Sequence, residues 1–247
     1  MLNQLLVVPL CMEWLILITV LAPNALANRK WVLKKPGLGI FLWLFLLISA
    51  RFAFLIAFSV AVVNVFRIWF ELESQPLGSA GWFGAALASF APWLFLALAG
   101  ISLALMGQVV EPQLQRAKVQ QTQLDLLPRP SMFFGGVGVC VIELPIPAAF
   151  VTRSRGSWVI VISSVTQSLL GSEELEAVLW HELGHIKYRH NALKKLVNVL
   201  NLLTPWFAVT QELSSQVSTL TEIQADNFAL RSCQAQHLQA ARAVFTF

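Results

Sequence analysis

Two histidines and a glutamate form the pattern HExxH in the segment His181-Glu182-Leu183-Gly184-His185. On an α-helix, residues four apart lie on one face about one turn apart, so both imidazoles can reach a single metal ion. Glu182 is offset by about 100° and projects beside that ion, where it can take a proton from a metal-activated water molecule. The pattern alone is only suggestive, because a surface helix with coincidental histidines would carry it too.

A catalytic zinc ion needs a third protein ligand and an open position for water. Residues 221–230 repeat a helical pattern in which Glu222 can complete a His₂Glu site. Asp226, one turn further on, can hold a ligand imidazole by its outer N–H. His190 and His237 are weaker alternatives for the third ligand. A solvated helix face is the competing interpretation of the two acids.

The helix that carries HExxH is predicted to begin at Ser172 and to run for about five turns. Acids occupy its first turn and bases its far end, as the helix dipole favours: Glu173, Glu174 and Glu176, then Lys187, Arg189 and His190. Apolar residues at three- and four-residue spacing predict one buried face: Leu175, Val178, Leu179 and Ile186.

A small, partly exposed sheet is predicted before this helix. Three short β-branched runs indicate strands at residues 137–142, 148–151 and 158–162. The turn-forming residues 152–157 predict that the last two strands form a hairpin. The Gly135-Gly136 pair and two nearby prolines limit the first strand and indicate that it lies at an edge.

The composition is that of a membrane protein, with 57% hydrophobic and 12% charged residues, against about 45–50% and 25% in soluble domains. Apolar stretches at about 2–22, 38–70 and 82–106 are each long enough to span a bilayer. The first lacks a basic leading region and contains Glu13, which favours a retained anchor over a cleaved signal peptide. Glu13 and Arg51 are costly inside a span, and we expect them to pair across the bundle or reach the headgroups rather than to act in function.

The charges of the short loops predict the orientation. Basic residues at 29–35 and again at 116–129 flank an acidic loop at 71–73, which places the N-terminus outside and everything after about Gly107 in the cytoplasm. We therefore expect an anchor at 1–106, a linker at 107–130 and a globular α+β domain at 131–247. Residues 192–209 are predicted to form an interfacial helix rather than a fourth span.

Three classes of protein are disfavoured by the composition and the cysteine count. The bases are not gathered into an aromatic-interleaved patch, so no nucleic-acid partner is expected. Three cysteines, at Cys11, Cys140 and Cys233, do not make a disulfide framework. A structural zinc site is also disfavoured, because such sites are usually closed by four ligands rich in cysteine.

The C-terminal half, about residues 142–230, resembles the membrane-bound gluzincin metallopeptidases, specifically the family of HtpX and the CAAX-prenyl endopeptidases. The segments that carry the resemblance are PIPAAF, EELEAVLWHELGHIKYRH and EIQADNFAL. The BlaR-type antirepressor peptidases are a related family. One departure is Ala148, which precedes Ala149-Phe150 where many members have asparagine, and it puts substrate alignment in doubt.

The resemblance implies a zinc-dependent endopeptidase that acts on membrane-associated or misfolded proteins in a bacterial-type plasma membrane. It assigns one Zn²⁺ to His181, His185 and Glu222, and the general base to Glu182. We expect an extended peptide substrate to add a strand near residues 148–151. The oxyanion-stabilising residue stays open among Tyr188, His190, Arg231 and His237. The alternative function is a membrane sensor whose metalloprotease domain cleaves a regulator or itself, although the outer loop is too short for a ligand-binding domain.

Overall fold

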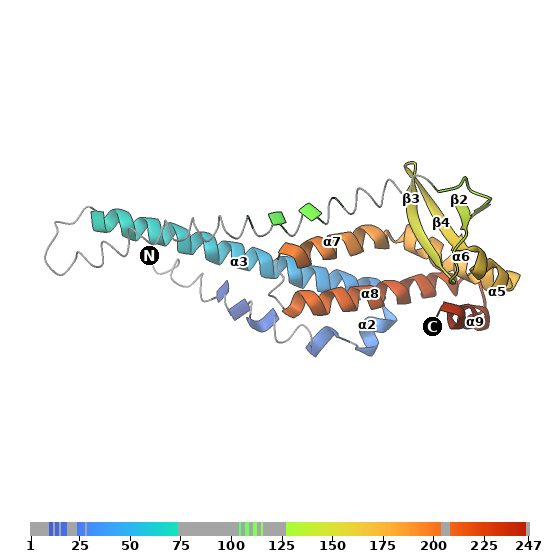
Figure 1. Cartoon of the computed structure of the whole chain (residues 1–247). Coiled ribbons are helices and arrows are strands. Elements are labelled where there is room, and N and C mark those ends of the chain that lie inside the picture. The colour runs from blue at the N-terminus through green and yellow to red at the C-terminus, as the bar shows by residue number, and fades with distance from the viewer. Residues whose placement is uncertain are drawn as a thin grey trace.

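The computed structural model describes residues 10–11, 13–14, 16–18, 24–27, 29–73, 104, 107–108, 111–112, 115, 127–203 and 208–245. The strands are β1 (Met132–Phe134), β2 (Val137–Ile142), β3 (Ala149–Ser154) and β4 (Ser157–Ser163). The labelled helices are α2 (Lys30–Lys34), α3 (Pro36–Glu73), α5 (Ser164–Leu169), α6 (Ser172–Lys187), α7 (His190–Leu203), α8 (Ala208–Ala229) and α9 (Ala235–Phe245). The sheet, α5, α6 and α9 lie together beyond the start of α3, while α7 and α8 run along it (Figure 1).

The four strands form one sheet in the order β1-β2-β4-β3. Strands β3 and β4 are antiparallel, as predicted, but the turn between them is shorter than the predicted 152–157. Only Arg155 and Gly156 lie between the strands, with φ angles of 50° and 82°. Positive φ at both central residues is what a two-residue hairpin turn of type I′ requires. Strand β2 pairs with β4 in parallel.

The predicted edge position of β2 is wrong, because β1 covers its outer side as an antiparallel strand. Gly135 and Gly136 have φ angles of 55° and 79° and connect β1 to β2. The glycine pair therefore makes a tight hairpin turn instead of ending the sheet. The free edge beside α6 is that of β3.

Helix α6 packs its predicted apolar face on the sheet. Leu179 is buried together with Val139, Ile160 and Ile162, and Leu175 and Ile186 pack against this cluster. Glu174 accepts a hydrogen bond of 2.7 Å from the backbone N–H of Gly171 and so caps the start of the helix.

The predicted extension of α6 to His190 is wrong. The helix ends at Lys187, Arg189 has a left-handed φ of 54°, and His190 is the first residue of α7. A residue with positive φ cannot continue a right-handed helix, so the chain changes direction here. His190 therefore does not share a helix with His185.

Helices α7 and α8 pack against the first half of α3 in one apolar cluster. Ile40, Trp43 and Leu47 of α3 are buried there with Val197 of α7 and three residues of α8, namely Leu213, Val217 and Leu220. Helix α8 begins well before the predicted segment 221–230, since its buried apolar residues recur at helical spacing among the polar ones.

Helix α3 contains the predicted span 38–70. Among the described residues, its segment Pro36–Ala57 is the one helix that is long and apolar enough to cross a membrane, judged by length and composition. The predicted span 82–106 lies outside the described residues apart from residue 104, and the span 2–22 is described only in part. Arg51 donates a hydrogen bond of 2.8 Å to the backbone carbonyl of Leu200, so it pairs across the bundle as expected.

Candidate metal centre

The side chains of His181, His185 and Glu222 converge from two helices. The Nε2 atoms of the two histidines are 3.1 Å apart, and Oε2 of Glu222 lies 3.3 Å from that of His181 and 3.5 Å from that of His185. Among the described residues these three form a group of potential metal ligands, and it includes no cysteine. Glu222 comes from α8 and both histidines from α6, as the sequence predicted for a three-ligand set.

The size of this triangle matches a tetrahedral zinc site. Zinc–nitrogen and zinc–oxygen bonds of about 2.0–2.2 Å at tetrahedral angles separate neighbouring ligand atoms by about 3.3 Å. The three measured separations, 3.1 to 3.5 Å, bracket that value. Two imidazoles and one carboxylate are also ligand types that zinc accepts. The residues therefore fit a zinc ion without rearrangement of the helices.

The close approach of α8 to α6 positions the third ligand. A Cβ atom on Gly184 would lie 3.1 Å from Cα of Ala225 and 3.2 Å from the ring of Phe228. Glycine between the two histidine ligands therefore allows α8 to pack directly on α6. Glu222, one turn before Ala225, is held at the distance the triangle requires.

His181 is held by a carboxylate on its outer nitrogen. Oδ1 of Asp226 lies 3.0 Å from Nδ1 of His181, and Oδ2 of Asp226 accepts a hydrogen bond from Arg242 of α9. Burial would lower the pKa of His181, but hydrogen bonds to Asp226 and Glu222 raise it to about 9. Asp226 thus occupies the position in which it can fix the tautomer and direct Nε2 at the triangle.

His185 is held by a second histidine, His190, whose position in the sequence did not indicate this role. Nδ1 of His190 lies 2.8 Å from Nδ1 of His185, and Nε2 of His190 lies 3.2 Å from Oε1 of Gln224. With Nε2 of His185 directed at the triangle, its Nδ1 donates to His190, which in turn donates to the Gln224 oxygen. Burial is the main cause that lowers the pKa of His190, to about 4, so the ring is neutral as this arrangement requires.

Glu222 is also paired on its second oxygen. Nζ of Lys194, on α7, lies 3.0 Å from Oε1 of Glu222. Burial would raise the pKa of Glu222, but hydrogen bonds from His181, His185 and Lys194 hold it far below its usual range. The carboxylate is therefore ionised, as a metal ligand must be.

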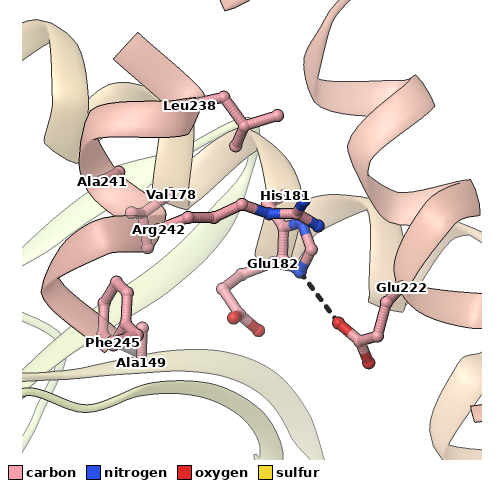
Figure 2. A pocket seen from close by; sticks show the side chains of 9 residues that line it. All are labelled: Ala149, Val178, His181, Glu182, Glu222, Leu238, Ala241, Arg242 and Phe245. Carbon is pink, nitrogen blue, oxygen red and sulfur yellow. Dashed lines mark ion pairs between the residues drawn. The ribbon is translucent and has the colours of Figure 1, made fainter. Parts of the chain in front are cut away.

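Glu182 lines a cavity of about 260 Å³ beside the triangle. The other lining residues are His181 and Glu222, Ala149 of β3, Val178 of α6, and Leu238, Ala241, Arg242 and Phe245 of α9. Figure 2 shows the Glu182 carboxylate directed into the space between Glu222 on one side and Phe245 and Ala149 on the other. Glu182 is buried, and this burial raises its pKa above the usual range for a glutamate.

The four candidates for stabilising an oxyanion do not line this cavity. Tyr188 stacks on His190 behind the ligand pair, and His237 lies 3.0 Å from Glu173 near the start of α6. Arg231 is exposed in the turn after α8. The cation that lines the cavity is Arg242. No sequence spacing indicated it, since α9 is joined to the site only by tertiary packing.

A pair of histidines on one helix, an acid between them and a glutamate from a second helix define the site of the HExxH metallopeptidases. A family model described as Peptidase family M48 matches residues 113–247, and the chain belongs to this family. The chain is 27% identical to a protease HtpX homolog 2 of Methanosarcina mazei over 177 residues. These residues make up 70% of this chain and 54% of that protein.

A protease HtpX homolog of Pyrococcus abyssi is 27% identical over 156 residues, which cover 62% of this chain and 44% of that protein. The resemblance to the HtpX family is thereby confirmed. The chain spans about half the length of the curated relatives it matches.

Proposed function

We propose that this protein is a zinc-dependent endopeptidase that cleaves membrane-associated or misfolded proteins at the membrane surface. The observation that carries the proposal is the ligand triangle of His181, His185 and Glu222, whose sides of 3.1–3.5 Å suit a tetrahedral ion. The buried carboxylate of Glu182 lines the cavity beside it. Membership of peptidase family M48 supports the same activity.

Zinc held by these three residues would supply a Lewis acid and an acidified water at its open position. Glu182 is the general base: it takes a proton from the attacking water and passes it to the nitrogen of the leaving amine. Burial favours this role, because a raised pKa lets the protonated form exist long enough to act as the acid in the second step. Asp226 and His190 keep the two imidazoles in the tautomer and orientation that the site needs.

A peptide substrate can pair with the free edge of β3. Ser163 donates to the carbonyl of Ala148 across the hairpin, so in the antiparallel register Ala149 and Val151 direct their N–H and C=O groups to the other side, toward the free edge. Ala149 also lines the cavity that contains Glu182. A strand added at Ala149 would therefore carry its backbone past the ligand triangle.

Asn191 restricts how far this pairing extends. Its side-chain amide donates a hydrogen bond of 3.1 Å to the carbonyl of Val151, which is one of the edge-facing groups. A substrate strand would meet an occupied carbonyl two residues after Ala149. Backbone pairing is therefore concentrated at Ala149, directly beside the site.

The cavity suits an apolar substrate side chain. Glu182 delivers its proton to the leaving amine, so the residue that contributes that amine lies nearest to it. Apolar side chains form most of the cavity wall, namely Ala149, Val178 and the residues Leu238, Ala241 and Phe245 of α9, while Arg242 in the same wall is paired with Asp226. We therefore place a large apolar side chain on the amine side of the scissile bond.

The position of the site relative to α3 supports action at a membrane. Gly37, near the start of the candidate span, lies close enough to Gln224 that an added Cβ would be 3.4 Å from its Nε2 atom. If α3 crosses the bilayer, the ligand set lies near the surface at which the helix begins. The predicted orientation makes this surface the cytoplasmic one, in a bacterial-type plasma membrane.

Proteolysis of an unfolded membrane protein in detergent tests the proposal. Zinc-loaded wild type should cleave, and Glu182→Gln should bind zinc equally but cleave at least about 100-fold more slowly. Glu176→Gln removes an exposed carboxylate from the same helix and should match the wild type. Turnover by Glu182→Gln at the wild-type rate would contradict the assignment of the base.

A further inference from the structure

Lys194 contacts the predicted metal ligand Glu222 on the oxygen that faces away from the histidines. Oε2 of Glu222 completes the triangle, at 3.3 and 3.5 Å from the two Nε2 atoms. Oε1 lies 3.0 Å from Nζ of Lys194. The two oxygens of one carboxylate therefore have separate partners, one set on α6 and one on α7.

The ion pair between Lys194 and Glu222 bears on the geometry of the candidate metal site more than on the stability of the fold. The side chains of Lys194 and Glu222 are 39% and 42% exposed, and half-exposed ion pairs contribute little to stability. Lys194 lies one turn after His190, which holds the ligand His185, so a single face of α7 contacts two of the three ligands. Helix α7 also packs against α3 and α8 through a separate apolar cluster that contains Val197.

A carboxylate can bind a metal ion through one oxygen or through both. Binding through both would add a ligand atom and crowd the position that a catalytic site keeps open for water. An ammonium group bonded to one oxygen opposes this, since that oxygen would have to leave a charge-assisted hydrogen bond to reach the metal.

We propose that Lys194 is a positioning residue that keeps Glu222 a single-oxygen ligand and thereby keeps the fourth coordination position open. The inference rests on the proposed zinc site, and it adds a requirement that the three ligands alone do not impose. Loss of the lysine frees Oε1 to turn toward the ion, which raises the coordination number and blocks the water position. An arginine at the same position retains a donor that can reach the carboxylate.

The chain provides a matched control in the next residue. Lys195 carries the same charge on the same helix, but it is exposed to solvent. Replacing Lys194 or Lys195 with methionine changes the net charge equally and preserves most of the side-chain length. A difference between the two variants therefore reports on the contact with Glu222 and not on charge or helix stability.

The test is the visible absorption spectrum of the cobalt(II)-substituted protein, since cobalt bands weaken as the coordination number rises from four. Wild type, Lys195→Met and Lys194→Arg should give the intense four-coordinate spectrum. Lys194→Met and Lys194→Gln should give weaker bands, and in the zinc enzyme kcat should fall about 10–100-fold with little change in KM.

A four-coordinate spectrum and wild-type kcat for both Lys194→Met and Lys194→Gln would overturn the proposal. Circular dichroism of each variant shows that a lost spectrum does not come from unfolding. Failure of the wild type itself to bind cobalt or zinc would overturn the zinc site, which separates failure of the proposed function from failure of the role of Lys194.

Discussion

Nδ1 of His190 lies 2.8 Å from Nδ1 of His185, although the two residues belong to different helices. The left-handed Arg189 between them turns the chain back so that the first residue of α7 meets the last histidine of HExxH. Gln224 completes the chain of contacts on the far side of His190. The candidate metal ligand His185 is thus oriented by the helix break that follows it.

Replacing His190 with phenylalanine should weaken zinc binding about 10–100-fold, because Nδ1–H of His185 loses its buried acceptor. Phenylalanine retains a ring of similar size in this buried position. Competition with a chromophoric chelator measures the affinity. His237→Phe, which removes a histidine that pairs with Glu173 at the far side of α6, should leave the affinity unchanged. Equal affinities for both variants would refute the role of His190.

Enlarging Gly184 should separate the two ligand helices. A valine there would press on Cα of Ala225 and the ring of Phe228, and overpacking of this kind costs about 1–3 kcal/mol of stability. Since Glu222 moves with α8, zinc affinity should fall as well, and alanine should have a smaller effect than valine. Gly37→Ala is the control, because its added Cβ makes only an ordinary contact at 3.4 Å. Zinc affinity of Gly184→Val equal to that of the wild type would show that helix spacing does not set the site.

The apolar cavity predicts substrate preference. In a peptide series that varies only the residue on the amine side of the scissile bond, kcat/KM should be highest for leucine or phenylalanine and lowest for aspartate. Phe245→Ala removes one wall and should reduce the preference for phenylalanine over alanine about 10-fold, within the 1–3 kcal/mol that apolar pockets discriminate.

Phe150→Ala is a matched control for Phe245→Ala. The two phenylalanines are 37% and 38% exposed, but Phe150 does not line the cavity. Its removal should leave the order of substrates unchanged. If both variants shift the preference equally, or if the wild type shows no preference, the cavity does not determine substrate specificity.

The candidate catalytic residues could be predicted from the sequence because HExxH is a local pattern on a helix with acids at its start. Glu222 and Asp226 could be predicted because a catalytic zinc ion needs a third protein ligand. These two acids lie one turn apart on a second predicted helix. The roles of His190, Lys194 and Arg242 depend on how α7 and α9 dock against α6 and α8. Periodicity within each helix contains no information about that docking.

The same limit explains the error at the sheet edge. A glycine pair ends a strand in sequence, but its two positive φ angles also suit a hairpin to the three-residue strand β1. So short a strand has no periodicity by which it can be recognised. Strand β3, whose hairpin turn was evident in the sequence, was predicted correctly as the partner of β4.

Zinc affinity should rise with pH. The pKa of His181 in the metal-free protein is about 9, so below that pH zinc must displace a proton from this residue. Zinc affinity should therefore decrease about 10-fold for each unit by which the pH is lowered, or about 100-fold between pH 8 and pH 6. Calorimetry in buffers of different ionisation enthalpy should detect the proton released on binding. An affinity independent of pH over this range would contradict the protonated state of His181.

The central claim is that His181, His185 and Glu222 hold zinc while Glu182 acts on water beside it. The most direct measurement is the zinc content of purified protein after dialysis, compared between Glu222→Ala and Glu182→Gln. We expect about one zinc ion per chain in the wild type and in Glu182→Gln, and almost none in Glu222→Ala. Full zinc occupancy in Glu222→Ala, or loss of zinc from Glu182→Gln, would contradict it.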